Sequence, residues 1–184
     1  MLKVGDLEKL MQKIIEDKYR ELGYDKNIDE KFSKIRPFEG NAIGQIGDEF
    51  AKAIIKDFTE IVEEGVIHDE YDIKTKKGVL VEVKTARKGK KNNTFQFNGI
   101  NPKYNYKFLL CLGITENSLH FRIFPKENIS YVHKEKRFYM KQGDFSKQLV
   151  KMNPDNQVNY KLTLSLKELF DISLLCEQLE SILS

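Results

Sequence analysis

The sequence predicts an α/β fold in which a mixed central β-sheet is flanked by helices. Three observations lead to this prediction. Amphipathic helical patterns lie near both ends, short alternating segments lie between them, and one continuous apolar run has the length of a central strand. With 184 residues the chain can form a full hydrophobic core, so a single domain is expected over residues 1–184.

Two helices are expected first. Residues 6–22 carry apolar side chains down one side, and a polar connector occupies residues 23–40. Residues 41–63 then form a second amphipathic helix, which opens a core expected to extend over residues 41–125. The residues of its apolar stripe are Ile46, Phe50, Ala53, Ile54, Phe58 and Ile61.

A β-hairpin should follow the second helix. Residues 79–83 alternate between valine and other residues, which is typical of a half-buried strand, and residues 72–75 supply a short partner strand. Residues 76–78 fit a three-residue loop with glycine in the left-handed conformation. That loop would place Asp72 directly opposite Glu82.

The continuous apolar run at residues 107–114 is expected to be the central strand of the sheet. Residues 119–124 alternate and would pair with it through the turn at residues 115–118. Pro125 ends this second strand because it cannot donate a ladder hydrogen bond.

The C-terminal part is less regular. Residues 126–156 show no clear period, whereas residues 158–164 alternate again and predict a late strand. Ser165 and Glu168 match a capping box, which would open the final helix. The apolar stripe of that helix comprises Leu169, Ile172, Leu175, Leu179 and Ile182.

The predicted pairing of Asp72 with Glu82 indicates a metal site. Directly opposed residues have Cβ atoms about 4.5–5.5 Å apart. Two carboxylates at that distance repel each other unless a cation or a proton lies between them. Mg²⁺ suits such oxygen ligands, and the main-chain carbonyl of Val83 would be a third ligand. Mn²⁺ is expected to substitute for Mg²⁺.

Lys84 lies on the same strand face as Glu82 and would orient or deprotonate an attacking water. Close to a metal and partly buried, its pKa should fall. An acidic residue two positions before a lysine occurs four times in the chain, so the Glu-Val-Lys tripeptide carries no weight alone. An ordinary solvated hairpin is the alternative interpretation.

Glu49 is the expected third carboxylate. It lies three residues after Ile46 and four before Ala53, so it should point toward the packed face of its helix. A carboxylate there needs a partner, and a metal site or the active-site lysine would serve. Glu49 would then complete a second metal site or hold the attacking water. Alternatively, Glu49 extends its charge to solvent at the helix boundary or caps the first turn.

Together, Glu49 on a helix, Asp72 on the next strand and Glu82-Val83-Lys84 resemble the PD-(D/E)XK nuclease superfamily. The glycine-containing helix start at residues 44–50 also looks like that of such enzymes. The resemblance implies a restriction-endonuclease-like core and Mg²⁺-dependent hydrolysis of DNA, most like a small type II restriction endonuclease. One departure is Tyr71, where the family often has proline.

The segment from Val83 to Thr115 contains no Asp or Glu, although the whole chain has a net charge of only +3. Such a local excess of cations favours phosphate binding, and the amides within it are suited to reading base edges. A flexible basic surface loop is the alternative. The residues expected to contact DNA are Arg87, Lys88, Lys90, Lys91, Asn92, Asn93, Gln96, Asn98, Asn101 and Lys103.

Double-stranded DNA is therefore the expected partner. A restriction enzyme would act beside a DNA methyltransferase encoded nearby, and a palindromic site would favour a homodimer. Residues 126–184 would then aid DNA binding or dimerisation. A structure-specific nuclease for junctions or repair, and a non-catalytic DNA-binding domain of the same fold, are the alternatives.

A cytoplasmic location is expected, with no membrane partner. The first twenty residues are charged throughout and lack the apolar core of a signal peptide. The longest apolar run, residues 108–114, is too short to span a bilayer. The two cysteines lie in apolar segments and suggest no disulfide framework, which suits a reducing compartment.

Overall fold

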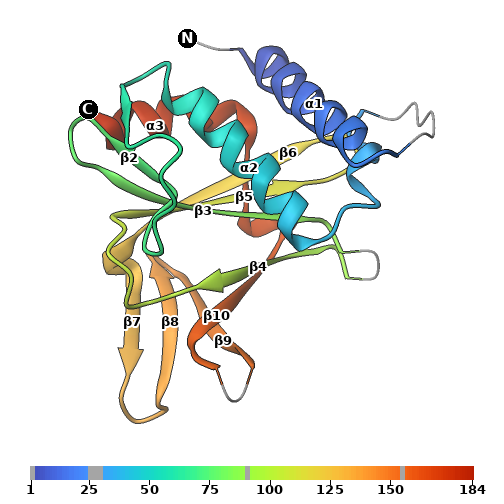
Figure 1. Cartoon of the computed structure of the whole chain (residues 1–184). Coiled ribbons are helices and arrows are strands. Elements are labelled where there is room, and N and C mark those ends of the chain that lie inside the picture. The colour runs from blue at the N-terminus through green and yellow to red at the C-terminus, as the bar shows by residue number, and fades with distance from the viewer. Residues whose placement is uncertain (1–2, 25–30, 90–91, 154–155) are drawn as a thin grey trace.

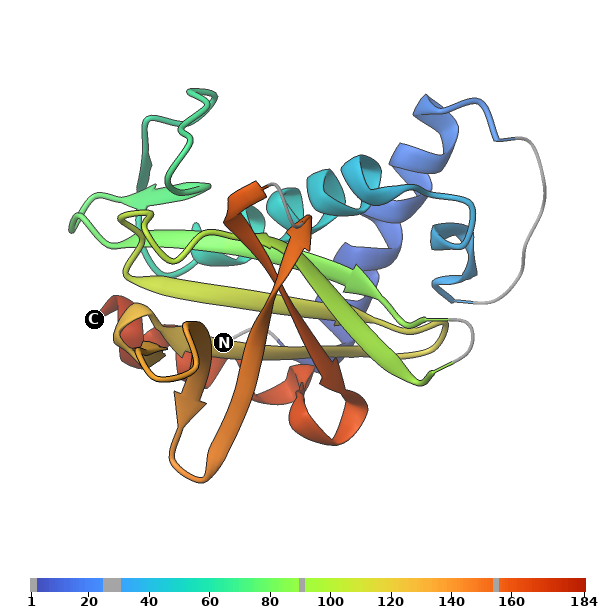
Figure 2. The same ribbon diagram turned by 90° about the horizontal axis from the view of Figure 1, so that it is seen from below.

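Three layers make up the fold: helices, a six-stranded sheet and a five-stranded sheet (Figures 1 and 2). The computed structural model describes residues 3–24, 31–89, 92–153 and 156–184. One cluster of buried apolar side chains lies between the helices and the six-stranded sheet, and a second lies between the two sheets. None of the described helices is long and apolar enough to cross a membrane.

All three helices pack on one face of the six-stranded sheet, through the first apolar cluster. They are α1 (Val4–Glu21), α2 (Gly40–Ile55) and α3 (Leu175–Leu183). The expected α/β class with a mixed central sheet and flanking helices is confirmed. The opposite face of that sheet is covered by strands, which the sequence did not predict.

α2 is shorter than predicted. Instead of continuing to residue 63, it ends at Ile55. There the Phe58 N–H donates to the Ile55 carbonyl, three residues earlier, instead of to the carbonyl four residues earlier as in an α-helix. Residues Ile61–Val62 form a short strand, β1. The prediction was wrong because Phe58 and Ile61 pack against the core from a turn and a strand, so their spacing imitates a helix.

The predicted hairpin is confirmed. It consists of β2 (Ile73–Thr75) and β3 (Leu80–Arg87). Ile73 pairs with Val81, which is the register that the sequence predicted. The three-residue loop also holds, since Thr75 N–H donates to the Val79 carbonyl at 3.0 Å and Gly78 has a φ of 79°.

β5 (Phe108–Ile114) is the predicted central strand, and every one of its residues is buried. The six-stranded sheet has the order β1-β2-β3-β5-β6-β11, in which β3 and β5 run parallel and the other pairs antiparallel. β6 spans Leu119–Pro125. Between β3 and β5 the chain crosses to the other sheet as β4 (Thr94–Ile100), so this crossover contains a strand rather than a helix.

The five-stranded sheet has the order β4-β10-β9-β8-β7. Its other strands are β7 (Ile129–Val132), β8 (Arg137–Gln142), β9 (Phe145–Asn153) and β10 (Asn156–Ser165). The late strand was predicted, but the irregular region expected before it is wrong. A two-residue turn at Gly143, with φ 57°, joins β8 to β9 and pairs Gln142 with Phe145.

The capping box at Ser165 does not open the final helix. Both of its hydrogen bonds are present, but they cap a single 3-10 turn, Leu166–Glu168. The chain then forms β11 (Phe170–Asp171), which pairs with β6, and a second 3-10 turn, Ile172–Leu174, before α3 begins. The capping signal is local, so it specified a turn but not its continuation.

Candidate metal centre and nucleic-acid groove

The candidate site lies at the start of β2, where β3 continues past it. The ladder between the two strands stops at Ile73 and Val81, which leaves the next part of β3 beyond the reach of β2. There the N–H of Val83 donates a 2.7 Å hydrogen bond to the Asp72 carboxylate. The carbonyl of a strand residue faces the same edge as its N–H, so the Val83 carbonyl also lies at this edge.

β3 divides its side chains between two environments. Val81 and Val83 are buried in the apolar cluster beneath the helices. Glu82 points to the other side of the strand and is only 4% exposed. The Lys84 ammonium forms an ion pair with the Glu82 carboxylate. The strand alternation therefore brings the predicted acid and lysine together.

Asp48, rather than Glu49, is the third carboxylate of the site. Asp48 lines the same pocket as Asp72 and Lys84. Glu49 is exposed and does not line that pocket, so the prediction that it points toward the packed face is wrong. It lines a neighbouring cavity, to which Asp48 also contributes. The prediction used the spacing from Ala53 to place Glu49 on the packed face, but Ala53 is itself only half-buried, at the margin of the apolar stripe.

The glycine at position 47 is the sequence signal that could have identified Asp48. A Cβ added at Gly47 would lie 1.6 Å from Thr85 Oγ1, so only glycine allows α2 to lie this close to β3. That contact fixes which side of α2 faces the strand. Asp48 follows directly and so reaches the edge of β3.

The carboxylates of the site are electrostatically crowded. Burial and the nearby Asp72 charge raise the pKa of Glu82 to about 7. The same two causes raise the pKa of Asp48 to about 7, although Lys52 and Lys84 oppose the shift. Burial opposes the charged form of Lys84, but Glu82 and Asp72 outweigh it and raise the pKa of this lysine. The expectation of a lowered pKa refers to the metal-bound site and stays a prediction.

These residues fit a divalent cation of the Mg²⁺ type. Asp48, Asp72 and Glu82 together carry three negative charges when ionised, whereas Lys84 supplies one compensating positive charge. Among the described residues, no three His, Cys, Asp or Glu side chains approach closely enough to form a metal site by themselves. Mg²⁺ does not need such a cage, because it commonly binds one or two carboxylates and keeps several waters.

No protein-family model matches this sequence, and no curated protein matches it either. A functional conclusion therefore rests on the geometry of the site, which also includes a buried tyrosine and a polar groove.

Tyr106 is buried within the electrostatic influence of Glu82. Burial and the charge of Glu82 raise the pKa of its hydroxyl. Within the part of the chain that the structure describes, this buried hydroxyl has no hydrogen-bond partner. Lys126 places its ammonium 4.3 Å from the centre of the Tyr106 ring and donates to the Tyr104 carbonyl. The Tyr106 hydroxyl is therefore a buried polar group near Glu82 that can still form a hydrogen bond.

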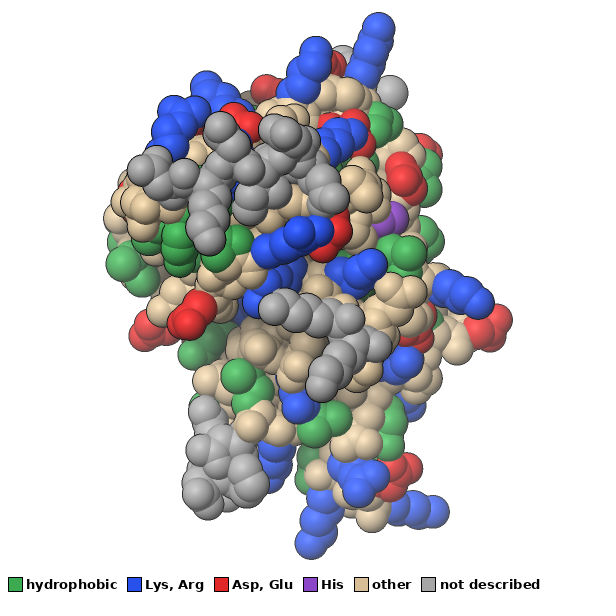
Figure 3. Space-filling view, turned by 90° about the vertical axis from the view of Figure 1, so that its right-hand side faces the viewer, with side chains coloured by type: hydrophobic (Ala, Val, Ile, Leu, Met, Phe, Trp, Pro, Cys, Tyr) green, Lys and Arg blue, Asp and Glu red, His purple; other side chains and the backbone are tan. Residues whose placement is uncertain are grey.

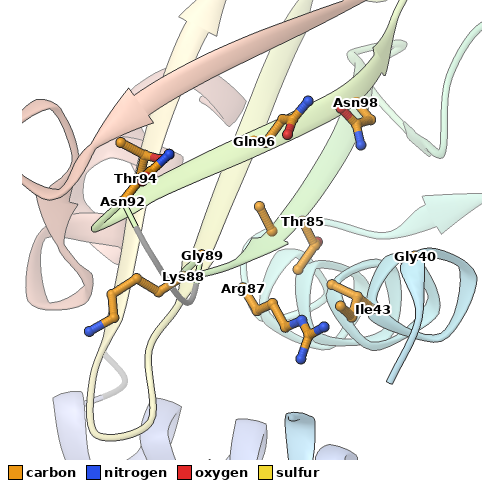
Figure 4. A pocket seen from close by; sticks show the side chains of 11 residues that line it. Gly40, Ile43, Thr85, Arg87, Lys88, Gly89, Asn92, Thr94, Gln96 and Asn98 are labelled. Atoms are coloured by element: carbon orange, nitrogen blue, oxygen red, sulfur yellow. The ribbon is translucent and has the colours of Figure 1, made fainter. Parts of the chain in front are cut away.

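A groove continues from the site toward the end of β3. The pocket that contains Asp72 shares Gly40, Thr85, Gln96 and Asn98 with a neighbouring cavity of about 490 Å³. Figure 4 shows this cavity between the start of α2, the end of β3 and strand β4. Five residues that were expected to contact DNA line it: Arg87, Lys88, Asn92, Gln96 and Asn98.

The other expected DNA contacts are distributed differently. Lys90 and Lys91 lie outside the described residues. Asn93 is exposed in the turn before β4, and Lys103 is exposed in the loop after it. Asn101 is a correction, because it is only 4% exposed and its side-chain oxygen accepts a 2.9 Å hydrogen bond from the Lys103 N–H. This asparagine builds a turn and does not face the groove.

Proposed function

We propose that this protein is a Mg²⁺-dependent endonuclease that hydrolyses phosphodiester bonds of double-stranded DNA. The observation that carries the proposal is the convergence of Asp48, Asp72 and Lys84 in one pocket, with buried Glu82 paired to that lysine. The groove that continues from this pocket is lined by cations and amides. Carboxylates for a metal and cations for phosphates are the two requirements of such an enzyme.

The arrangement of elements supports a core of the PD-(D/E)XK type. A helix, α2, contributes one carboxylate, and the hairpin that follows contributes Asp72 and the Glu82-Val83-Lys84 run. A parallel strand, β5, lies beside the catalytic strand. The carboxylate that α2 contributes is Asp48 rather than Glu49, so the resemblance holds with this residue one position earlier in the sequence.

Asp72, Glu82 and the Val83 carbonyl would hold the metal ion. When bound, Mg²⁺ or Mn²⁺ lowers the pKa of a water and offsets the charge that develops on the phosphate. In the metal-free chain, Glu82 and Asp72 raise the pKa of Lys84. Lys84 would orient the attacking water or steady the phosphate.

Arg87 and Lys88 would contact phosphates, although the Arg87 guanidinium also donates to the Arg36 carbonyl. They lie at the far end of the groove, whereas Gln96 and Asn98 of β4 line both the groove and the pocket. Side-chain amides of this kind form paired hydrogen bonds with adenine edges. The proximity of amides to the metal centre favours cleavage at a short specific sequence, as in small type II restriction endonucleases.

Digestion of a sequenced plasmid in Mg²⁺, with the ends mapped, tests this proposal. The wild-type chain should give discrete fragments, and EDTA should abolish them. Asp72→Asn should slow cleavage by at least about a thousandfold, whereas Asp69→Asn, an exposed residue just before the hairpin, should cleave normally. Cleavage by Asp72→Asn at the wild-type rate would refute the site. A smear, or cleavage of branched substrates alone, would refute the restriction function.

A further inference from the structure

The five-stranded sheet is free of acidic residues in its strands. β4, β7, β8, β9 and β10 contain no Asp or Glu, in a chain that has 28 of them. The same strands contain basic residues on β8, β9 and β10. In Figure 3, Lys and Arg side chains are spread over the face shown, and some of them lie at the lower end of the molecule, where Figure 1 places these strands. The lack of acidic residues noted after β3 thus recurs in these strands, whereas the connections between them contain Glu135, Asp144 and Asp155.

The two faces of this sheet differ. Buried side chains such as Phe97, Leu149 and Leu162 point inward and pack against the six-stranded sheet. Strand alternation therefore turns their neighbours outward. Residues that the argument uses on this outer face are Gln96, Asn98, Arg137, Lys141, Met152 and Lys161.

A β-bulge joins the outer face to the catalytic pocket. Tyr160 pairs with Ile100 and Leu162 with Phe97, so Lys161 alone lies opposite both Asn98 and Gly99. Gly99 has a φ of 77°, which favours glycine at this position.

Met152 of β9 completes this connection. The N–H of Gly99 donates to Met152 Sδ at 3.0 Å, and both residues line the pocket that contains Asp72. Lys161 is consequently the outer-face cation beside the bulge that borders the proposed metal centre. The outer face and the pocket form one continuous surface.

We propose that the outer face of the five-stranded sheet is a docking surface for the phosphate backbone of duplex DNA. This inference rests on the proposed function and assigns a role to residues 126–184. Arg137, Lys141 and Lys161 contact phosphates, and Gln96 and Asn98 face the duplex where it enters the pocket. Lys161 pairs with Val150 and Lys141 with Ser146, so the two lysines are two strand spacings apart across the sheet and four residues apart along it, roughly 16 Å. A duplex presents several phosphates over that distance.

Charge complementarity selects this partner. The outward cations alternate with amides and hydroxyls, and no acidic side chain on these strands opposes a polyanion. A protein-binding face of this size would be expected to have an apolar centre. Here the exposed large apolar residues lie on three separate strands: Tyr131 on β7, Val150 and Met152 on β9, and Val158 on β10.

Binding of a fluorescein-labelled duplex, followed by anisotropy, tests the inference. All variants are made in the full-length Asp72→Asn chain, so that DNA is not cleaved. Lys141→Ala with Lys161→Ala should raise Kd at least about tenfold and reduce the salt slope of log K by about two. The matched control is Lys9→Ala with Lys13→Ala, two exposed lysines of α1 in the helical layer, and its Kd should stay within about twofold of the parent. Equal melting temperatures establish that both variants are folded.

The outcomes separate this inference from the proposed function. If the wild-type chain cleaves plasmid while the sheet variants bind like the control, the sheet surface is refuted and the nuclease stands. If the sheet lysines govern binding but plasmid is never cleaved, the nuclease is refuted and the surface stands. If no duplex binds, or single-stranded RNA competes better than duplex DNA, the docking proposal is overturned.

Discussion

Gly47 and Thr85 are in direct contact: a Cβ on Gly47 would lie 1.6 Å from Thr85 Oγ1 and 2.7 Å from Thr85 Cβ. Among the glycines that the structure describes, an added Cβ would meet no closer contact than this one. It sets the distance between helix and strand, and with it the position of Asp48 relative to Asp72. A packing requirement and a functional position are thus adjacent in the sequence.

Gly47→Ala should destabilise the fold by about 1–3 kcal/mol, because the new methyl group must displace helix or strand. Adding Thr85→Ala removes the closest contact and should recover part of the loss. Gly44→Ala is the matched control in the same helix, where a Cβ meets nothing within 4 Å and should stabilise slightly. Urea unfolding measures all three. Equal stability of Gly47→Ala and Gly44→Ala would contradict the close contact between Gly47 and Thr85.

Asp48→Asn and Glu49→Gln form a matched pair of neighbouring substitutions. Asp48 shares the pocket with Asp72, so its loss should reduce the single-turnover cleavage rate at least about a hundredfold. Glu49 is exposed outside that pocket, and its variant should stay within about twofold. Plasmid cleavage in Mg²⁺ gives both rates. The reverse order would restore Glu49 as the third carboxylate.

Lys84→Ala should lower the rate of bond cleavage by about 10²–10⁴-fold, as expected when a group that positions the water or phosphate is lost. Binding of duplex DNA should change far less. Lys76→Ala is the control, since this lysine lies in the loop of the same hairpin and forms an exposed ion pair with Glu60. A cleavage rate for Lys84→Ala close to that of the control would exclude Lys84 from the chemistry.

The stability of the metal-free protein should fall as pH rises. Glu82 and Asp48 have pKa values of about 7 in the folded chain, against model values of 4.5 and 3.8. The folded state therefore holds more protons between these limits, and stability is lost as pH rises from about 4 to 7. Each shift alone corresponds to a loss of about 3–4 kcal/mol, and the two losses do not simply add because the carboxylates interact.

Thermal melts at pH 5 and pH 8 in EDTA measure this loss, and Asp48→Asn should reduce the difference. Mg²⁺ should stabilise the protein more at pH 8, by about 2.7 kcal/mol at a hundredfold excess over Kd. Glu49→Gln should keep the wild-type dependence on pH. A melting temperature that rises from pH 5 to pH 8 in EDTA would contradict carboxylate crowding.

Local patterns accounted for much of the fold. The hairpin that presents Glu82 was predictable because its loop length, its glycine and its valine alternation all specify one register. The central strand was predictable because all of Phe108–Ile114 is apolar enough to be buried on both faces. Each of these signals lies within a few residues of the element it specifies.

The errors arose where distant segments decide the outcome. The phase of α2 depends on Thr85, which is far from Gly47 in the sequence, so periodicity alone favoured Glu49 over Asp48. The second sheet depends on pairing between β4 and β10, whose residues Phe95 and Leu164 meet only in the folded chain. Its outer face carries polar residues, and its strands therefore lacked the apolar continuity that identified β5.

The hydrogen bond from Val83 N–H to Asp72 has a consequence for self-association. A strand that outlasts its neighbour presents main-chain donors to any other chain that can add a strand there. Asp72 occupies the first such donor and places a charge beside it. Asp72→Ala would remove a metal ligand and would also leave the Val83 N–H free to pair with another chain. Dimers formed at this strand edge would block the DNA groove. Asparagine keeps an acceptor for Val83, which makes Asp72→Asn the variant whose loss of cleavage reports on chemistry alone.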